Sequence, residues 1–189
     1  KSTTAALIAR FLATSNARVF LGGNIRRSVF EFLSKVRARD AVVLELSSFQ
    51  LQDLSLNSVS PHIAVLTNIL PDHLNWHRTM QEYMRAKSVI FRFQKKTDYL
   101  FANPDDPRVR MLAQGAKSHV IMPRLSLRFR TLVDDRLGAH YRTSVALAIA
   151  VAKCRGIPEK NIRAVLASFS GLEGRQQILS MIKEVHVVN

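Results

Sequence analysis

One carboxylate, Glu45, lies at the end of an apolar run at residues 41–46. The run is too apolar to face water, so we expect a buried strand there. An ionised carboxylate at the mouth of a buried strand is costly unless it is paired or bound to a metal ion. Folds that alternate strands and helices collect their ligands at such strand ends. The position of Glu45 therefore favours an ion pair or a metal ligand.

Two further segments supply groups that could serve the same site. The chain opens with Lys-Ser-Thr-Thr at residues 1–4, and Pro-Asp-His at 71–73 follows a second apolar run at 63–67. In a phosphate-binding loop the lysine contacts the β and γ phosphates, and the next hydroxyl ligates Mg²⁺. Ser and Thr are also ordinary caps at helix starts. The sequence thus offers a phosphate grip and two types of metal ligand, with low specificity for each motif alone.

Each candidate also has an ordinary structural interpretation. Glu45 could cap a turn or pair with one of the many arginines, His73 could be a loop histidine beside a Pro-Asp turn, and Lys87 could be a solvated lysine on an amphipathic helix. The glycines at 22 and 23 could simply permit a tight turn. Taken one at a time, these residues leave both interpretations open.

The order of the motifs along the chain is more specific than any one of them. Lys-Ser-Thr-Thr is followed by Gly-Gly-Asn at 22–24, Glu-Leu-Ser-Ser-Phe-Gln-Leu at 45–51, Asp-His-Leu at 72–74 and Tyr-Met-Arg-Ala-Lys at 83–87. This order resembles the central ATPase domain of the Mur ligases. Three later motifs extend the resemblance over most of the chain: Asn-Pro-Asp-Asp-Pro at 103–107, Gly-Ala-His at 138–140 and Phe-Ser-Gly-Leu-Glu-Gly-Arg at 169–175.

Within that family, the motif at 45–51 is most similar to the branch that adds D-glutamate. The resemblance implies an ATP-dependent ligase that joins D-glutamate to UDP-N-acetylmuramoyl-L-alanine in peptidoglycan synthesis, through an acyl phosphate, with ATP and Mg²⁺ required. A folylpolyglutamate synthase-like ligase shares the ATPase core and is the alternative enzyme. The Ser-Ser-Phe-Gln-Leu sequence argues against it.

The resemblance also implies roles for individual residues. Lys87 matches a lysine that the family carries as a carbamate, which needs a neutral amine and is therefore favoured by partial burial. Magnesium prefers oxygen ligands, so a metal role for His73 depends on the resemblance alone. The implied residues are Lys1, Ser2, Thr3, His140 and Arg175 for ATP; Asn24 and Ser47 for the muramoyl substrate; Ser2, Glu45, His73 and Lys87 for metal; and Lys1, His73 and Lys87 for catalysis.

Several positions depart from the family pattern. Asn75 replaces an aspartate next to the implied metal ligand, and Arg26 replaces a glycine in the Gly-Asn-Ile-Gly motif. Tyr141 and Ser144 stand where relatives have asparagines that help to hold the nucleotide, and Gly174 stands where many have histidine. These departures place ATP affinity and catalytic competence in more doubt than ancestry.

Short apolar runs alternate with amphipathic segments along the whole chain. This pattern predicts an α/β fold with a mostly parallel sheet flanked by helices on both faces, as in a P-loop-type ATPase domain. The expected helices are 3–14, 27–37, 79–93, 142–155 and 159–168, and the expected strands are 18–21, 41–46, 62–67, 98–102, 118–122 and 179–188.

The family has three domains, and the 189 residues are enough for one with a sizeable core. We expect residues 1–168 to form the central ATP-binding domain, without its first strand and the glycine-rich part of its loop. Residues 169–189 would begin the C-terminal ligase domain. By itself, the chain is expected not to complete the ligase reaction.

Composition separates the remaining classes of protein. Lys and Arg number 28 against 14 Asp and Glu, a net charge of +14 that attracts polyanions. The basic residues are scattered and do not interleave with aromatic residues, so we expect no specific nucleic-acid partner. A basic, non-catalytic fragment that binds nucleotide or nucleic acid is the alternative from another class. One cysteine permits no internal disulfide, and no apolar run approaches membrane-spanning length, so a cytoplasmic protein without membrane insertion is expected.

Overall fold

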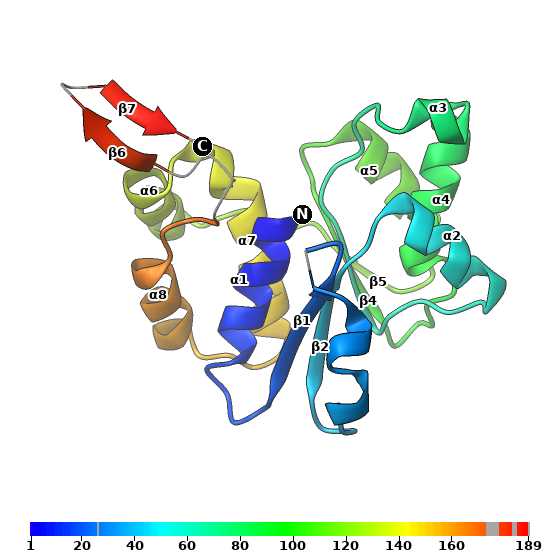
Figure 1. Cartoon of the computed structure of the whole chain (residues 1–189), viewed down its shortest axis with the longest axis horizontal. Coiled ribbons are helices and arrows are strands. Elements are labelled where there is room, and N and C mark those ends of the chain that lie inside the picture. The colour runs from blue at the N-terminus through cyan, green and yellow to red at the C-terminus, as the bar shows by residue number, and fades with distance from the viewer. Residues whose placement is uncertain (26, 173–177, 183–184, 189) are drawn as a thin grey trace. The chain divides into compact units, whose positions relative to one another are not determined.

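The computed structural model describes residues 1–25, 27–172, 178–182 and 185–188. The chain forms two compact units, and each unit is assembled from separate stretches of sequence. The first unit contains residues 1–21, 37–43 and 125–189, and the second contains residues 22–36 and 44–124. The helices and strands are labelled in Figure 1.

Helices alternate with short strands along most of the described chain. The α-helices are α1 (Ser2–Leu12), α2 (Ser48–Leu56), α3 (Leu74–His77), α4 (Met80–Arg92), α5 (Pro107–Ala113), α6 (Leu127–Arg136), α7 (Arg142–Cys154) and α8 (Glu159–Ser168). The 3₁₀ turns are η1 (Val29–Glu31), η2 (Leu33–Lys35) and η3 (Ala139–Tyr141). The strands are β1 (Val19–Gly23), β2 (Ala41–Glu45), β3 (Ile63–Leu66), β4 (Tyr99–Ala102), β5 (His119–Ile121), β6 (Ile178–Ile182) and β7 (Val185–Val188). Within the described ranges, no helix has the length and apolar character needed to cross a membrane.

The larger sheet, in the second unit, has the order β3-β4-β5, and both of its strand pairs are parallel. Its register aligns Ile63 with Tyr99 and Tyr99 with His119. Strands β1 and β2 form a separate pair. Parallel strands joined by helical connections are the arrangement that the alternating apolar runs predict. The expected α/β fold, with parallel strands flanked by helices, is confirmed.

The core of the first unit lies where α1 runs along α7 (Figure 1). Leu7 and Phe11 of α1 and Val145 and Leu147 of α7 are fully buried. Both helices are rich in alanine, which favours the helix and lets the two backbones approach closely. This packing fixes the start of α1, where the phosphate-loop residues of the sequence lie.

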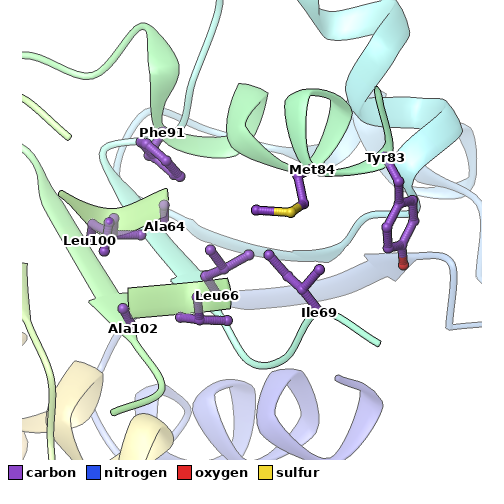
Figure 2. Close-up of a cluster of buried hydrophobic side chains, with 10 residues drawn as sticks. Ala64, Leu66, Ile69, Tyr83, Met84, Phe91, Leu100 and Ala102 are labelled. Atoms are coloured by element: carbon purple, nitrogen blue, oxygen red, sulfur yellow. The ribbon is translucent and has the colours of Figure 1, made fainter. Parts of the chain in front are cut away.

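In the second unit, α4 covers the sheet through a cluster of buried side chains (Figure 2). Met84 and Phe91 of α4 are buried with Leu66 of β3 and Leu100 of β4. Helix α4 is amphipathic, begins at a Thr79 cap and buries one stripe of its surface, as helices on a sheet do. Lys87, which belongs to the candidate site, is buried on the same helix between Met84 and Phe91.

Two expected elements were wrong. The helix expected at 27–37 is instead two 3₁₀ turns, because Phe32 between them adopts φ −132° and buries its side chain. The single strand expected at 179–188 is the antiparallel pair β6 and β7. Helices α2, α3, α5 and α6 were not expected from the sequence, whereas α1, α4, α7 and α8 lie within two residues of their expected bounds.

Candidate active site

Glu45 is the last residue of β2 and is buried, with 8% of its surface exposed. Its Oε2 atom has no hydrogen-bond partner among the described residues. A buried carboxylate oxygen without a donor is costly, and it is relieved by a cation. Magnesium takes oxygen ligands of this kind, so the environment of Glu45 fits the metal that the sequence implies.

The loop after β1 crosses closely over the end of β2. Asn24 donates its backbone N–H to the carbonyl oxygen of Glu45 at 2.7 Å. Gly23 has φ +89°, and a Cβ atom at this position would lie 2.3 Å from the same oxygen. Only glycine permits this approach. Gly22 and Gly23 thus hold the exposed side chain of Asn24 beside the end of β2 at which Glu45 lies.

Ser47 is the N-cap of α2 and follows Glu45 by two residues. Its hydroxyl accepts the Gln50 backbone N–H at 3.2 Å, and the Gln50 side chain accepts the Ser47 N–H at 2.9 Å. This reciprocal capping box fixes the direction in which the chain leaves β2. The hydroxyl expected to contact substrate therefore also caps a helix.

His73 immediately precedes α3 in the left-handed region, with φ 54°. Its imidazole is exposed, lies 5.0 Å from the Phe49 ring centroid, and has Nε2 3.4 Å from Asp72 Oδ2. Phe49 follows the capping serine of α2 by two residues. The aromatic contact therefore brings His73 to the segment that continues from Glu45.

Lys87 is buried on α4, with 4% of its surface exposed, so the interpretation of a solvated lysine is wrong. Its Nζ atom lies 5.3 Å from the ring centroid of Tyr83. The Tyr83 ring in turn contacts the His77 ring at 5.2 Å. Burial, and then the negative charge of Asp72, raise the pKa of Tyr83. Lys87 thus stands at one side of a buried aromatic and histidine cluster.

His77 is the residue that sequence reasoning missed. It is 2% exposed, its Nε2 lies 2.9 Å from Ser48 Oγ, and its ring stacks on Phe49. Burial, and then the nearby charge of His73, lower the pKa of His77, which keeps its imidazole neutral near pH 7. The spacing of four residues between His73 and His77 was the one available signal.

The expected phosphate-binding residues lie in the first unit. Lys1 is exposed at the N-cap position of α1, Ser2 is buried and Thr3 is half-buried. Thr4 Oγ1 is buried without a hydrogen-bond partner in the described part of the chain. The first N–H groups of a helix have no partner within the helix and attract anions. This helix start fits a phosphate group.

The last two expected ATP-binding residues differ in what the structure says of them. His140 is exposed in η3, with its ring 4.3 Å from the Tyr141 ring. Arg175 lies outside the described residues.

Across the described ranges, no three His, Cys, Asp or Glu side chains form a ready metal site. Magnesium commonly keeps several waters and phosphate oxygens, so one or two carboxylate-type ligands suffice for it.

The parallel strands flanked by helices define the class of the fold, an α/β domain. Residues 1–144 match the family model of the Mur ligase middle domain, and the chain belongs to this family. The MurF ligase from Thermotoga maritima in complex with ADP has a TM-score of 0.69 at 17% identity, over 99% of this chain and 50% of that one. FolC from E. coli in complex with ADP has a TM-score of 0.61 at 17% identity, over 98% and 58%.

The curated relatives carry one particular name. A UDP-N-acetylmuramoylalanine–D-glutamate ligase from Symbiobacterium thermophilum is 36% identical over the whole of this chain and 46% of its own length. The enzyme of the same name from Streptococcus equi subsp. zooepidemicus is 34% identical over the whole chain and 45% of its own length. This chain therefore spans about half the length of the curated relatives that it matches.

Proposed function

We propose that this chain is the ATP-binding part of a ligase that adds D-glutamate to UDP-N-acetylmuramoyl-L-alanine. The names of the curated relatives support the choice of substrates. The observation that carries the chemistry is the buried Glu45 carboxylate, whose Oε2 lacks a hydrogen-bond donor among the described residues. A carboxylate kept in this state favours a cation, as ATP-dependent phosphoryl transfer requires.

In this proposal the start of α1 binds phosphate. The N–H groups at the start of α1 and the Lys1 ammonium contact the phosphate oxygens, with Ser2 or Thr3 beside them. His140 and Arg175 are proposed to contact the nucleotide, as the family pattern implies. Residues 1–168 would form the central domain, and residues 169–189 would begin the next.

The residues at the end of β2 would orient the carboxylate that becomes phosphorylated. Asn24 and Ser47 contact the muramoyl substrate from the two loops at the end of β2. Magnesium, when bound, would neutralise charge on the phosphate oxygens during transfer of the γ-phosphoryl group. Glu45, His73 and a carbamylated Lys87 would hold it. The substrate carboxylate attacks the γ-phosphorus to form an acyl phosphate with release of ADP, and the D-glutamate amine then displaces phosphate.

A Mg-ATP titration in one buffer, at one Mg²⁺ concentration, separates this proposal from a non-catalytic basic fragment. We expect the unvaried chain to bind Mg-ATP and the Glu45→Gln chain to bind it at least tenfold more weakly. The Asp53→Asn chain is the matched control, because it loses one exposed carboxylate from α2. Equal affinity in all three chains, or no binding in any, contradicts the proposal and favours the basic fragment.

The substrate is tested with the longer protein that contains both flanking domains. Phosphate release that depends on D-glutamate supports the proposed ligase, whereas release that depends on a folate and L-glutamate supports the folylpolyglutamate synthase-like alternative. The curated relatives favour the first outcome, because they carry D-glutamate ligase names, whereas FolC is similar in fold at 17% identity. A cytoplasmic location remains a prediction.

A further inference from the structure

A buried hydrogen bond joins the first residue of α2 to the last residue of α3 in the second unit. Ser48 Oγ lies 2.9 Å from His77 Nε2, and the two residues are 1% and 2% exposed. The other ring nitrogen of His77, Nδ1, is buried without a hydrogen-bond partner in the described ranges. The bond to Ser48 is therefore the polar contact that orients this imidazole.

Aromatic packing supports the same link. The His77 ring stacks on Phe49 at 5.6 Å with an interplanar angle of 23°, and it contacts Tyr83 at 5.2 Å. Phe49 also contacts the His73 ring at 5.0 Å. One phenylalanine, next to Ser48 in the chain, thus touches both histidines. Rings at these separations interact favourably beyond the area that they bury.

The Ser48–His77 hydrogen bond joins two chain segments that each carry a candidate metal ligand. Ser48 follows Glu45 by three residues, and the capping box at Ser47 fixes the chain between them. On the other side, His77 donates its backbone N–H to the carbonyl oxygen of His73 at 3.0 Å. The Ser48–His77 bond therefore ties the segment with Glu45 to the segment with His73.

Helix α3 needs this external support because its own backbone is strained. It has four residues, and it is flanked by His73 at φ 54° and Arg78 at φ 59°. Arg78 is the centre of a γ-turn in which Thr79 N–H donates to the His77 carbonyl oxygen at 2.6 Å. Positive φ costs a residue with a side chain about 1–2 kcal/mol. Such strain persists where surrounding contacts maintain it, commonly at functional sites.

We propose that His77 is a positioning residue, which holds the His73 turn against the Glu45 segment through its hydrogen bond to Ser48. Its consequence for nucleotide binding rests on the proposed function; the anchoring of α3 does not. Loss of this hydrogen bond would loosen α3 against α2, where the Trp76 Nε1–Gln52 Oε1 hydrogen bond of 3.3 Å and the Phe49–Trp76 ring contact would remain. The buried cluster between α4 and the sheet would remain, since neither Ser48 nor His77 belongs to it.

The chain contains its own reporter for this movement. Its one tryptophan, Trp76, lies in α3 next to His77 and is 63% exposed. We expect Ser48→Ala and His77→Phe each to raise the acrylamide quenching constant of Trp76 by about 1.5-fold, as this side chain approaches full exposure. The double variant should rise no further. Ser55→Ala, which removes a hydroxyl that donates to the Gln52 carbonyl oxygen within α2, should leave quenching unchanged.

The same variants test the positioning role in binding. We expect Ser48→Ala and His77→Phe to weaken Mg-ATP binding about tenfold, an amount that corresponds to one buried hydrogen bond. His77→Gln, which retains an acceptor for the Ser48 hydroxyl, should recover part of this loss. Each single variant should also lose about 1–3 kcal/mol of stability without ligand, because it leaves a buried polar atom without its partner, so binding is compared at a temperature where all the chains are folded.

Distinct results overturn the two proposals. Unchanged Trp76 quenching in both single variants, or quenching effects that add in the double variant, refutes the anchoring by His77. Increased quenching with unchanged Mg-ATP affinity refutes its positioning role. Failure of the proposed function appears differently, as no Mg-ATP binding by the unvaried chain or equal binding by Glu45→Gln, and the quenching result still decides whether His77 anchors α3.

Discussion

Replacement of Glu45 by glutamine should stabilise the metal-free chain while it weakens Mg-ATP binding at least tenfold. Glutamine has nearly the same size as glutamate and carries no charge. The buried Oε2 atom of Glu45 has no hydrogen-bond partner among the described residues, so this oxygen lacks a donor in the metal-free chain. A site that is favourable for a cation is unfavourable for folding without one.

The structure sets the size of this effect. A buried polar atom without a partner costs about 1–3 kcal/mol, and glutamine relieves the part due to charge, so we expect a gain of about 1–2 kcal/mol. For a chain of this length, that gain raises the thermal midpoint by roughly 3–6 °C. Mg-ATP at 100 times the Kd of the unvaried chain should stabilise that chain by about 2.7 kcal/mol, and a variant that binds tenfold more weakly by about 1.4 kcal/mol. The stability advantage of the variant should therefore shrink by about 1.3 kcal/mol or more when ligand is added.

Urea unfolding followed by Trp76 fluorescence measures the change in stability of the structural unit that contains Glu45. Trp76 and Glu45 both belong to the second unit, so the signal does not depend on whether the two units unfold together. Asp53→Asn serves as the control, because an exposed substitution on α2 should change stability by less than about 0.5 kcal/mol. A metal-free Glu45→Gln chain that is no more stable than the unvaried chain would refute the reasoning, since Glu45 would then be satisfied without a cation.

Three further predictions follow from backbone geometry and charge. Gly23→Ala should destabilise the chain by about 3 kcal/mol or more in urea unfolding, because the new Cβ would lie 2.3 Å from a backbone oxygen. Gly156→Ala is the control: Gly156 has φ +73° and nothing within 4 Å of a Cβ, so this substitution should cost only about 1 kcal/mol. Arg78→Gly should stabilise the chain by about 0.5–1 kcal/mol by relieving φ 59°; a lower urea midpoint would contradict this. The Lys95 N–H, and then the side chain of His62, lower the pKa of Asp98, so its contribution to stability is present above about pH 4 and is lost as pH falls through the lower folded-state pKa. Midpoints measured from pH 5 to 2 should show the Asp98→Asn chain losing its disadvantage over that interval.

Regular elements with strong local signals could be predicted from the sequence. Helix α4 combines a threonine cap with one apolar stripe, and β3 is a short apolar run, so both were expected close to their observed bounds. Helix α2 was missed, although Ser47 and Gln50 have the spacing of a capping box. In the 27–37 segment the apolar residues have helical spacing, but only tertiary structure decides that Phe32 is buried while Phe30 is 86% exposed.

The candidate site also contains some residues that the sequence predicts and others that it does not. The strand that ends at Glu45 was inferred from the apolar run and is confirmed. Burial of Lys87 was implied by the family resemblance alone, because its position on an amphipathic helix gives no sign of it. His77 could not be assigned from the sequence, since its partners Ser48 and Tyr83 meet it only through packing of three separate helices.

The interleaving of the two units limits how this chain can be divided. The chain passes between the units at residues 21/22, 36/37, 43/44 and 124/125, so neither unit is a continuous piece of sequence. No single proteolytic cut releases either of them whole, and no simple gene fusion could have supplied one to the other. Separate expression of the part that carries Lys1 and the part that carries Glu45 would therefore require new connections between the segments of each.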